Sequence, residues 1–403
     1  MGNIQSLRGM KDIKDAESKL FTYFIDVASK IAKNYGYTYL ETPILEETAL
    51  FKRSVGESSD IVGKEMYQFI DKGEKDVCLR PEGTAGVVRM FVQNKLDRAG
   101  GVHKYFYYGP MFRYERPQKG RLREFHQFGC ESFGETSVYE DANIIMMISE
   151  ILKTLGIGYK LQLNSLGDSS CMPQYREKLL EFIQELDLCE DCQRRMVTNP
   201  IRVLDCKNEN CQKQLEDAPR ITYNLSTECH DEFEKLKSIL ETNDISYEVD
   251  PNLVRGLDYY SKTAFEFVSD EIGAQSAITG GGRYDRLTEF LGGRATPAIG
   301  FAIGIERLLE LIKMPQSTEE VLYIGAMDDE ALDVVFTQVA KKRKTTQVIT
   351  DYKSRGFGKH LNNAGKKGAT RVALIGENEL KDNTVWVKDL SSGNEETINI
   401  EDL

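Results

Sequence analysis

The stretch HKYFYYGPMFRYERPQKGRLREFHQFGCESF, residues 103–133, decides the fold of this chain. Its apolar first part predicts a strand over about residues 103–114, and a second strand returns over about residues 123–133. The polar loop between the two strands contains Pro117 and Gly120, which are residue types that favour turns. The stretch therefore predicts a long antiparallel hairpin.

Successive side chains of a strand point to opposite faces, so the residues that share a face of this hairpin follow from the sequence. One face carries Tyr107, Gly109, Met111, Arg113 and Glu115 from the first strand, and Phe125, Gln127, Gly129 and Glu131 from the second. Charged and amide groups are costly to bury unpaired, whereas glycines let a ligand approach closely. The pattern predicts a polar ligand site, with the alternative that the opposite face of the hairpin is buried and this face is merely solvated.

Hydrophobic periodicity predicts further elements around the hairpin. Apolar residues recur at helical spacing from Ser18 to Tyr35 and from Tyr139 to Leu155. Extended segments are predicted at residues 37–42, 247–249, 264–268 and 276–279, and residues 298–312 are predicted as a strand that runs into a helix. Beyond a linker at residues 313–320, strands at 321–327, 346–352 and 371–376 alternate with helices at 329–342 and 358–366. Such alternation predicts a small, separate α/β domain with parallel strand pairs.

Bulk composition is that of a globular protein of two or three domains, with 403 residues, 40% hydrophobic and 29% charged. The N-terminus lacks the apolar core of a signal peptide, and no stretch approaches the ~20 apolar residues of a membrane span, so we expect a cytoplasmic protein. The net charge of −12 argues against wholesale attraction to nucleic acid. Residues 341–371, however, contain ten Lys or Arg residues and one acid, Asp351, which indicates either a local basic patch or a solvated face.

Residues 168–222 are highly charged, contain a cluster of four cysteines, and are interpreted as an inserted module. The cysteines form two pairs, Cys189-x-x-Cys192 and Cys206-x4-Cys211. The first pair has good zinc-ligand spacing, whereas the second is at the loose end of the range. We expect reduced or partly buried thiols and assign no metal ligand, with zinc as the alternative.

Several segments together resemble one family. FRYERPQKGRLREFHQFGCE, residues 112–131, resembles motif 2 of class II aminoacyl-tRNA synthetases, in the form found in histidyl-tRNA synthetases. YGYTYLETPILEETALFKRSVGE, residues 35–57, resembles motif 1, which pairs two subunits, and PAIGFAIGIERLLELI, residues 297–312, resembles motif 3. LRPEGT at residues 79–84, RGLDYY at 255–260 and AITGGGRYDRL at 277–287 are similar to segments that border the histidine and ATP sites of that family.

The resemblance implies a set of functional residues. The catalytic residues it implies are Arg113, Arg255 and Arg307. The ATP site would be formed by Arg113, Glu115, Arg121, Arg123, Phe125 and Arg307. Histidine would be bound by Glu82, Thr84, Gln127, Glu131, Arg255, Tyr259, Tyr260 and Tyr284, and the tRNA acceptor end by Arg116 and Gln118.

The fold implied by the resemblance is an α+β catalytic domain, residues 1–316, with an antiparallel sheet flanked by helices. It contains the module at residues 168–222, and a C-terminal α/β anticodon-binding domain follows at residues 320–403. The implied activity is ATP-dependent ligation of L-histidine to its tRNA through histidyl-adenylate. ATP with Mg²⁺, histidine and tRNA(His) are the implied ligands. A homodimer formed through motif 1 is expected, and neither a tightly bound organic cofactor nor a membrane partner is expected.

Three alternatives remain at this point. A synthetase-like regulatory subunit of ATP phosphoribosyltransferase would typically lack the anticodon domain and the motif residues. Another class II synthetase, for threonine, proline or glycine, is disfavoured by LRPEGT together with RGLDYY. A stand-alone nucleic-acid-binding module fits poorly with the net charge of −12.

Overall fold

The computed structural model describes residues 3–56, 59, 61–118, 120–254, 257, 259–272, 277–314 and 320–403. The chain divides into two compact units, residues 1–313 and 314–403, and each is considered by itself. Within the described ranges, none of the helices has the length and apolar character needed to cross a membrane.

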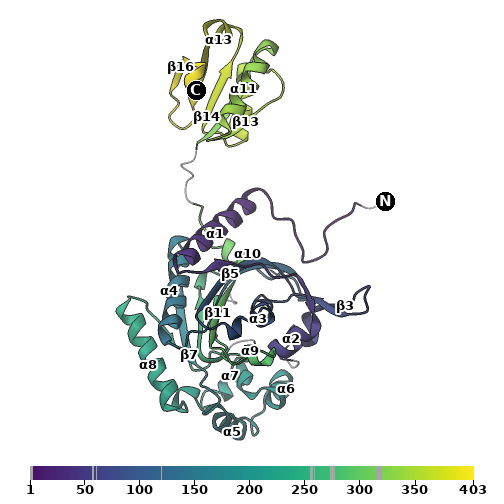
Figure 1. Ribbon diagram of the computed structural model, residues 1–403, viewed down its shortest axis with the longest axis vertical. Helices are drawn as coiled ribbons and strands as arrows, with labels where there is room; N and C mark the ends of the chain where they lie inside the picture. Colours follow the sequence, from purple (N-terminus) through teal and green to yellow (C-terminus); the bar gives the residue numbers. More distant parts are fainter. Residues whose placement is uncertain are drawn as a thin grey trace. The chain divides into compact units, whose positions relative to one another are not determined.

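The first unit is built on an eight-stranded sheet with the order β1-β5-β6-β11-β10-β9-β7-β8 (Figure 1). Its strands are β1 Thr38–Tyr39, β5 His103–Phe112, β6 Glu124–Phe133, β7 Lys160–Ser165, β8 Glu248–Val249, β9 Ser261–Val268, β10 Ala277–Arg283 and β11 Ala298–Gly304. All inner pairs are antiparallel, and only the two-residue outer strands β1 and β8 run parallel to their neighbours. The predicted antiparallel sheet is therefore confirmed.

The hairpin of β5 and β6 has the predicted register. Tyr107 lies opposite Gly129 and Gly109 opposite Gln127, so the two predicted faces coincide. β6 then pairs with β11, which places Gly300 opposite Glu131 and continues the same face across the sheet. The glycine-rich segment at residues 280–282 lies inside β10.

Helices cover the other face of this sheet. α1 Asp15–Asn34, α4 Val138–Thr154, α8 Thr227–Thr242 and α10 Ile305–Leu309 pack there (Figure 1). Phe128 and Cys130 of β6 and Phe301 of β11 join residues of these helices in one core, and all three are at most 2% exposed. The helices therefore pack against the apolar face of the sheet, and the polar face, which carries the predicted ligand site, stays uncovered by them.

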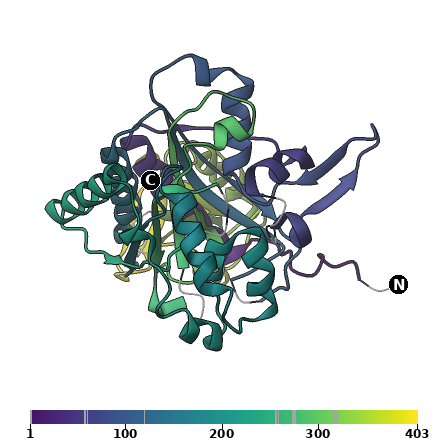
Figure 2. The same ribbon diagram turned by 90° about the horizontal axis from the view of Figure 1, so that it is seen from below.

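A smaller sheet, which the sequence did not predict, lies beside the polar face. Its strands, β2 Leu45–Glu47, β3 Tyr67–Ile70 and β4 Asp76–Leu79, have the order β2-β4-β3, and the β3–β4 hairpin projects from the unit (Figures 1 and 2). α2 Thr48–Val55, α3 Thr84–Gln93 and α9 Leu287–Phe290 accompany it. Short helical turns are η1 Ile61–Glu65, η2 Leu96–Arg98 and η5 Asp270–Ile272. α3 matters most for the site, because it begins at Thr84.

Residues 168–222 form a helical module with a core of their own. The elements are α5 Met172–Ile183, α6 Glu190–Thr198, η3 Pro200–Val203, α7 Glu209–Gln214 and η4 Ile221–Tyr223. The whole segment is described, and it contains no strand. Three of its clustered cysteines, Cys192, Cys206 and Cys211, belong to this core and are buried.

The second unit contains a five-stranded sheet with the order β13-β12-β14-β15-β16. Its elements are β12 Val321–Ala326, η6 Asp329–Ala331, α11 Leu332–Lys342, β13 Gln347–Thr350, α12 Phe357–Lys366, β14 Arg371–Ile375, α13 Glu377–Asp382, β15 Thr384–Asp389, β16 Glu395–Asn399 and η7 Ile400–Asp402. The predicted parallel pairs of β12 with β13 and β14 are confirmed. The antiparallel strands β15 and β16 are additions that the sequence did not predict.

Gly300 in β11 provides a direct test of this packing. A Cβ atom at Gly300 would overlap the Glu131 carboxylate and lie 2.6 Å from the Cys130 carbonyl oxygen. We expect Gly300→Ala to lower the free energy of unfolding by about 3 kcal/mol or more, because neither the backbone nor the buried carboxylate can move aside. Urea denaturation of the full chain measures this.

Gly304 at the end of the same strand is the matched control. A Cβ atom there would meet no atom within 4 Å. Gly304→Ala should therefore change the free energy of unfolding by less than about 1 kcal/mol. Equal destabilisation by both substitutions would contradict the proposed packing of Glu131 against Gly300.

Candidate functional site

A cavity of about 320 Å³ lies on the polar face of the large sheet. It is lined by side chains from the β5–β6 hairpin, β9, β10, β11, α10 and the segment before β9. Ten residues that the sequence predicted for the site line it: Glu82, Thr84, Arg113, Glu115, Arg121, Phe125, Gln127, Tyr259, Tyr260 and Arg307. The structure thus brings the predicted histidine-binding and ATP-binding groups to one cavity.

Arg113 follows β5 and is held from several sides. Its Nε donates to the Pro81 carbonyl oxygen at 2.9 Å, and its guanidinium lies 5.2 Å from the centre of the Phe125 ring. Glu115 approaches Arg113 Nη1 at 3.9 Å and Arg121 Nη1 at 3.2 Å. The Arg113 side chain is therefore positioned in the cavity before any ligand binds.

Arg307 of α10 reaches the same region from the opposite side of the hairpin loop. Its Nε donates to the Gly120 carbonyl oxygen at 3.3 Å and its Nη1 to the Ala277 carbonyl oxygen at 3.2 Å. Burial lowers the pKa of Arg307, and the charges of Arg121 and Arg113 lower it further. Like charges that repel one another in this way favour an anion such as a phosphate group.

Glu82 forms the acidic part of the cavity and also begins a helix. Its carboxylate accepts hydrogen bonds from the backbone amides of Thr84 at 2.8 Å and Ala85 at 2.9 Å, at the N-terminus of α3. Burial raises the pKa of Glu82, whereas these amides and the nearby charge of Arg113 act to lower it. The LRPEGT segment therefore fixes a buried carboxylate next to the arginines.

Glu131 lies behind the cavity wall and does not line the cavity. Its side chain is fully buried and accepts hydrogen bonds from the hydroxyls of Thr84 at 2.7 Å, Tyr107 at 3.2 Å, and Tyr284. Burial raises the pKa of Glu131 to about 8, although the hydrogen bonds from Tyr284 and Thr84 oppose this. The charge of Glu82 raises it as well.

Tyr259 contributes a buried hydroxyl that makes no hydrogen bond to the part of the chain that the structure describes. The nearby Thr84 hydroxyl donates to Glu131 instead. The Tyr259 ring contacts those of Tyr260 and Tyr284, with centres 4.7 and 5.6 Å apart. A buried hydroxyl of this kind is costly unless a ligand supplies its partner.

The other predicted residues lie apart from this cavity or outside the described ranges. Arg123 stacks over Tyr114, with its guanidinium carbon 3.8 Å from the ring centre, and its Nε donates to the Glu115 carbonyl oxygen. Arg116 and Gln118 are exposed in the hairpin loop. Tyr284 lies under Tyr259, and Arg255 falls outside the described residues.

Of the residues at or near the cavity that were not assigned from the sequence, Glu266, Glu306 and Tyr107 bear most on its chemistry. Glu266 of β9 lines it, and the signal was a single charge between two phenylalanines. Glu306 lines it as well, and its carboxylate accepts from the His126 backbone amide at 2.9 Å and lies 2.8 Å from His126 Nδ1. The Tyr107 hydroxyl donates a hydrogen bond to the Glu131 carboxylate.

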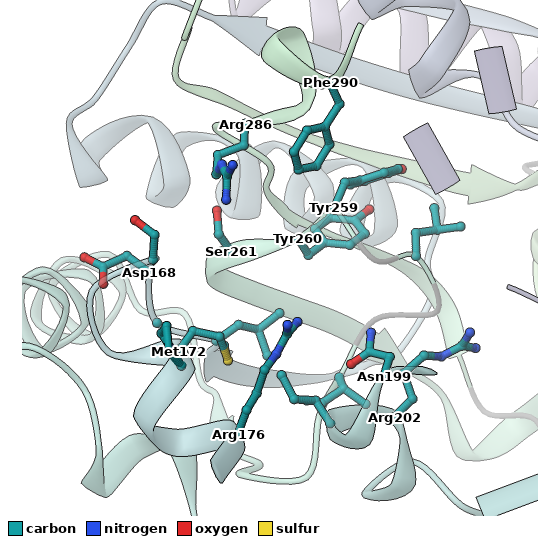
Figure 3. Close-up of a pocket in the computed structure, with 17 residues that line it drawn as sticks. Asp168, Met172, Arg176, Asn199, Arg202, Tyr259, Tyr260, Ser261, Arg286 and Phe290 are labelled. Atoms are coloured by element: carbon teal, nitrogen blue, oxygen red, sulfur yellow. The ribbon is translucent and has the colours of Figure 1, made fainter. Parts of the chain in front are cut away.

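A second cavity of about 520 Å³ adjoins the first across Leu257, Tyr259 and Tyr260, which line both. Figure 3 shows Arg176, Asn199 and Arg202 of the helical module on one side of it and Arg286 and Phe290 on the other. The helical module therefore contributes to a wall directly behind the tyrosines of the site.

Comparisons with known proteins agree with this geometry. A family model described as histidyl-tRNA synthetase matches residues 9–308, and one described as anticodon binding domain matches residues 321–403. A histidine--tRNA ligase of Sulfurimonas denitrificans is 66% identical over 397 residues, 98% of each chain. Another, of Campylobacter fetus, is 60% identical over 405 residues, 99% of each chain.

Among solved structures, apo histidyl-tRNA synthetase of S. aureus has a TM-score of 0.83 and 35% identity, and the match covers 99% of this chain and 98% of that one. This likeness confirms the expected class II synthetase fold, with a C-terminal anticodon-binding domain that has its own sheet. With one cavity that joins clustered guanidinium groups to a tyrosine-lined recess, and with relatives that match both units, the chain belongs to the histidyl-tRNA synthetase family.

Proposed function

We propose that this protein ligates L-histidine to tRNA at the expense of ATP, through a histidyl-adenylate intermediate. One observation carries the proposal: Arg113, Arg307 and Tyr259 line the same cavity of about 320 Å³. The guanidinium groups suit phosphate, and the buried tyrosine hydroxyl suits a polar heterocycle. The names of relatives that are 54–66% identical over nearly the full chain support the same activity.

The first step joins the amino acid to the nucleotide. A carboxylate oxygen of histidine attacks the α-phosphate of ATP, a new P–O bond forms, and the bond to pyrophosphate breaks. We assign Arg113 to the α-phosphate and the attacking carboxylate, and its contacts with Glu115 and Pro81, which hold its guanidinium in the cavity, support this role. Arg307 binds the adenine ring and the γ-phosphate. Catalysis rests on position and charge stabilisation and needs no side-chain nucleophile.

The family implies ATP as substrate and Mg²⁺ as its metal. Carboxylate oxygens are the protein ligands that Mg²⁺ prefers, and Glu115 and Glu266 both line the cavity. These two residues would hold the ion, which supplies charge neutralisation for the phosphates. Arg121 and Phe125 complete the ATP site, and Arg123 supports it through the Glu115 carbonyl oxygen. Arg255, from outside the described residues, is proposed as a further cation at the α-phosphate.

Histidine is recognised by the opposite end of the cavity. Glu82 accepts from the α-ammonium group, with Gln127 beside it, since the Gln127 amide oxygen is already fixed by the Gly83 amide at 3.1 Å. A neutral imidazole has one donor and one acceptor nitrogen, and the Tyr259 hydroxyl, which lines the cavity, can serve one of them. Glu131 acts from behind the cavity wall, through the hydroxyls that it holds. Thr84, Tyr260 and Tyr284 complete the recess, Thr84 and Tyr284 by holding the Glu131 carboxylate in place.

The second step transfers the histidyl group to the 3′ end of tRNA. Arg116 and Gln118 are exposed in the hairpin loop, where they can meet the acceptor end. In the second unit, residues 341–371 carry exposed cations, and the aromatic rings of Phe336 and Tyr352 are 55% and 72% exposed. Cations with exposed aromatic rings suit the unpaired bases of an anticodon loop.

Motif 1 is proposed to pair two subunits. Near Pro43, apolar side chains of β1, β2 and β3 stay uncovered in the single chain: Tyr39, Ile44, Leu45, Phe69 and Ile70 are 41–63% exposed. Burial of such a patch in a homodimer would remove apolar surface from water.

The domain boundaries and the location of the protein are also proposals. The compact units at residues 1–313 and 314–403 support a catalytic domain at residues 1–316 and an anticodon-binding domain at 320–403. The separate core of residues 168–222 supports an inserted module. We place the protein in the cytoplasm, where tRNA is charged. A regulatory subunit of ATP phosphoribosyltransferase is disfavoured, because the named relatives match both units.

ATP–pyrophosphate exchange with each amino acid in turn tests the activity. We expect stimulation by histidine alone, because the tyrosine-lined recess presents the unpartnered Tyr259 hydroxyl to an imidazole nitrogen. Arg113→Gln should lower kcat/KM for histidine-dependent exchange by about 100-fold or more, since a fixed charge at the reacting phosphate is lost.

Arg98→Gln is the control for this substitution, because Arg98 in η2 is 57% exposed and does not line the cavity. Its exchange rate should match that of the unchanged protein. Stimulation by a different amino acid, or normal exchange in the Arg113 variant, would overturn the proposal.

Tyr259→Phe separates binding from stability. Because the hydroxyl has no partner within the described residues, its removal should leave the free energy of unfolding of the free protein unchanged or raise it. The same change should raise KM for histidine about tenfold, the cost of one hydrogen bond. An unaltered KM in exchange assays would exclude Tyr259 from histidine recognition.

Glu131 gives a pH signature. Its pKa is raised from 4.5 to about 8 in the folded protein, so between these values the unfolded chain releases a proton that the folded chain keeps. The free energy of unfolding should therefore fall as pH rises through this window, relative to Glu131→Gln, which does not titrate. The slope should approach about 1.4 kcal/mol per pH unit.

Urea denaturation of both proteins at roughly pH 5, 6.5 and 8.5 measures this difference. The Gln variant cancels the titration of all other groups. If the difference in the free energy of unfolding between the two proteins stays constant over this pH range, the pKa of Glu131 is not raised in the folded protein.

A further inference from the structure

Four cysteines of the helical module converge on one point. The Sγ atoms of Cys189, Cys192, Cys206 and Cys211 all lie within 4.8 Å of one another, and those of Cys189 and Cys206 are 3.8 Å apart. We propose that these four sulfurs bind one zinc ion. The proposal goes beyond the ligase reaction and does not depend on it.

The spacing of the sulfurs fits a shared metal. Zinc binds thiolates at about 2.3 Å in a tetrahedron, and the edges of such a tetrahedron are about 3.8 Å long. A disulfide would instead need sulfurs at about 2.05 Å. The separation of the Cys189 and Cys206 sulfurs therefore matches two corners of a zinc site.

Two of the four sulfurs accept hydrogen bonds from backbone amides. The Cys189 backbone amide donates to the Cys211 sulfur at 3.3 Å, and the Asn208 amide donates to the Cys206 sulfur at 3.4 Å. Three of the four cysteines are buried, and Cys189 is half-buried. On binding, zinc would displace the thiol protons to solvent, and its charge would balance the thiolates that result.

Each cysteine pair brackets the start of a helix. Cys189 immediately precedes α6 and Cys192 lies in its first turn, whereas Cys206 precedes α7 and Cys211 lies within it. The Asn208 side chain caps α7 by accepting from the amides of Asn210 and Cys211. The loose spacing of the second pair is thus explained, because two extra residues form the cap.

The core of the module joins short helices, which a metal would reinforce. Its helices have 12, 9 and 6 residues, and helices shorter than about 12–15 residues are marginal alone. Small cores are commonly reinforced by metals or disulfides. A zinc ion would join α6 to α7 across the connection at residues 193–205.

This connection links the zinc site to the cavity behind the tyrosines. Asn199, Ile201 and Arg202 lie within it and line the cavity of about 520 Å³ that Tyr259 and Tyr260 also line (Figure 3). Zinc would therefore hold in place the wall that faces those tyrosines.

A second group, Asp168, Cys171 and Cys229, is the competing site within the described residues. It offers three ligand atoms, and the Asp168 carboxylate is already occupied by the amides of Ser170 at 2.9 Å and Cys171 at 3.2 Å. These hydrogen bonds form the turn that leads into α5, so the Asp168 carboxylate already has a structural role there. We assign the metal to the four-cysteine group.

Metal analysis of the full chain, purified under reducing conditions without chelators from zinc-supplied cells, tests the proposal. We expect about one zinc per chain and, by X-ray absorption, about four sulfurs at 2.3 Å. Less than about a tenth of an equivalent, both as purified and after incubation with zinc, would overturn it. A thiol count of four instead of eight in denaturant would indicate two disulfides and would also overturn it.

Variants locate the metal. Cys206→Ser and Cys211→Ser should lose zinc, whereas Cys78→Ala, which replaces a cysteine buried in another core, should keep it. Retention of zinc by both serine variants, or its loss only in Cys229→Ala, would place the metal elsewhere and refute the assignment.

Cobalt provides a readout that needs no variant. Replacement of zinc by Co²⁺ in the unchanged protein should give the intense visible absorption of tetrahedral thiolate coordination. Removal of the metal should increase proteolytic cleavage within residues 168–222 and leave the rest of the first unit resistant, because only the module loses its support. Absence of the thiolate bands after Co²⁺ uptake would refute thiolate coordination.

Discussion

The geometry of the site depends on the alternation of side chains along β6 and β11. On β6, Phe128 and Cys130 enter the core under α1 and α4, so Gln127, Gly129 and Glu131 must face the other way. β11 repeats the pattern, with Ile299, Phe301 and Ile303 in the core and Gly300, Ala302 and Gly304 opposite them. A slip by one residue would exchange the two sets. The largest apolar core of the protein therefore fixes the register, and the register fixes the site.

A site of this kind is less stable than a fully apolar sheet face would be. Burial of the Glu131 carboxylate costs free energy that its three hydroxyl donors only partly recover, since the pKa stays raised to about 8. The Tyr259 hydroxyl is buried without a partner in the described part of the chain. Both features are costs in the free protein, and a bound imidazole would relieve the second by supplying a partner to the Tyr259 hydroxyl. The helix-covered face offsets them, as is common where function conflicts with stability.

Regular strands made much of the site predictable from the sequence, and irregular features account for what was missed. The ends of β5 and β6 agree with the predicted strands to within two residues, because period-two alternation is strong there. Period-two alternation predicted which face of the sheet Glu131 lies on, but not that its side chain is fully buried. That burial depends on Gly300 of the neighbouring strand, which leaves room for the carboxylate. Glu266 was missed although it stands as a single charge between two phenylalanines, because that pattern alone does not show that the polar face of β9 borders the cavity. The sequence analysis assigned no strands beyond residue 376, so it missed both β15, which pairs on its two sides with β14 and β16, and the exposed edge strand β16. The spacing of the cysteines could not decide between a zinc site and free thiols. Whether the two cysteine pairs meet depends on how the intervening residues 193–205 fold.

Local charge explains how a protein with a net charge of −12 can bind two polyanions. In the first unit, the mutual repulsion of Arg113, Arg121 and Arg307 is part of what lowers the pKa of Arg307, and a triphosphate would relieve that repulsion. In the second unit, Asp351 collects hydrogen bonds or ion pairs from Tyr323, Arg355, Asn363 and Lys367. This single acid therefore orders the segment and leaves Lys341, Lys344 and Lys359 exposed. Net charge sets the long-range field, which salt screens within about 10 Å, so recognition is decided by these preorganised clusters.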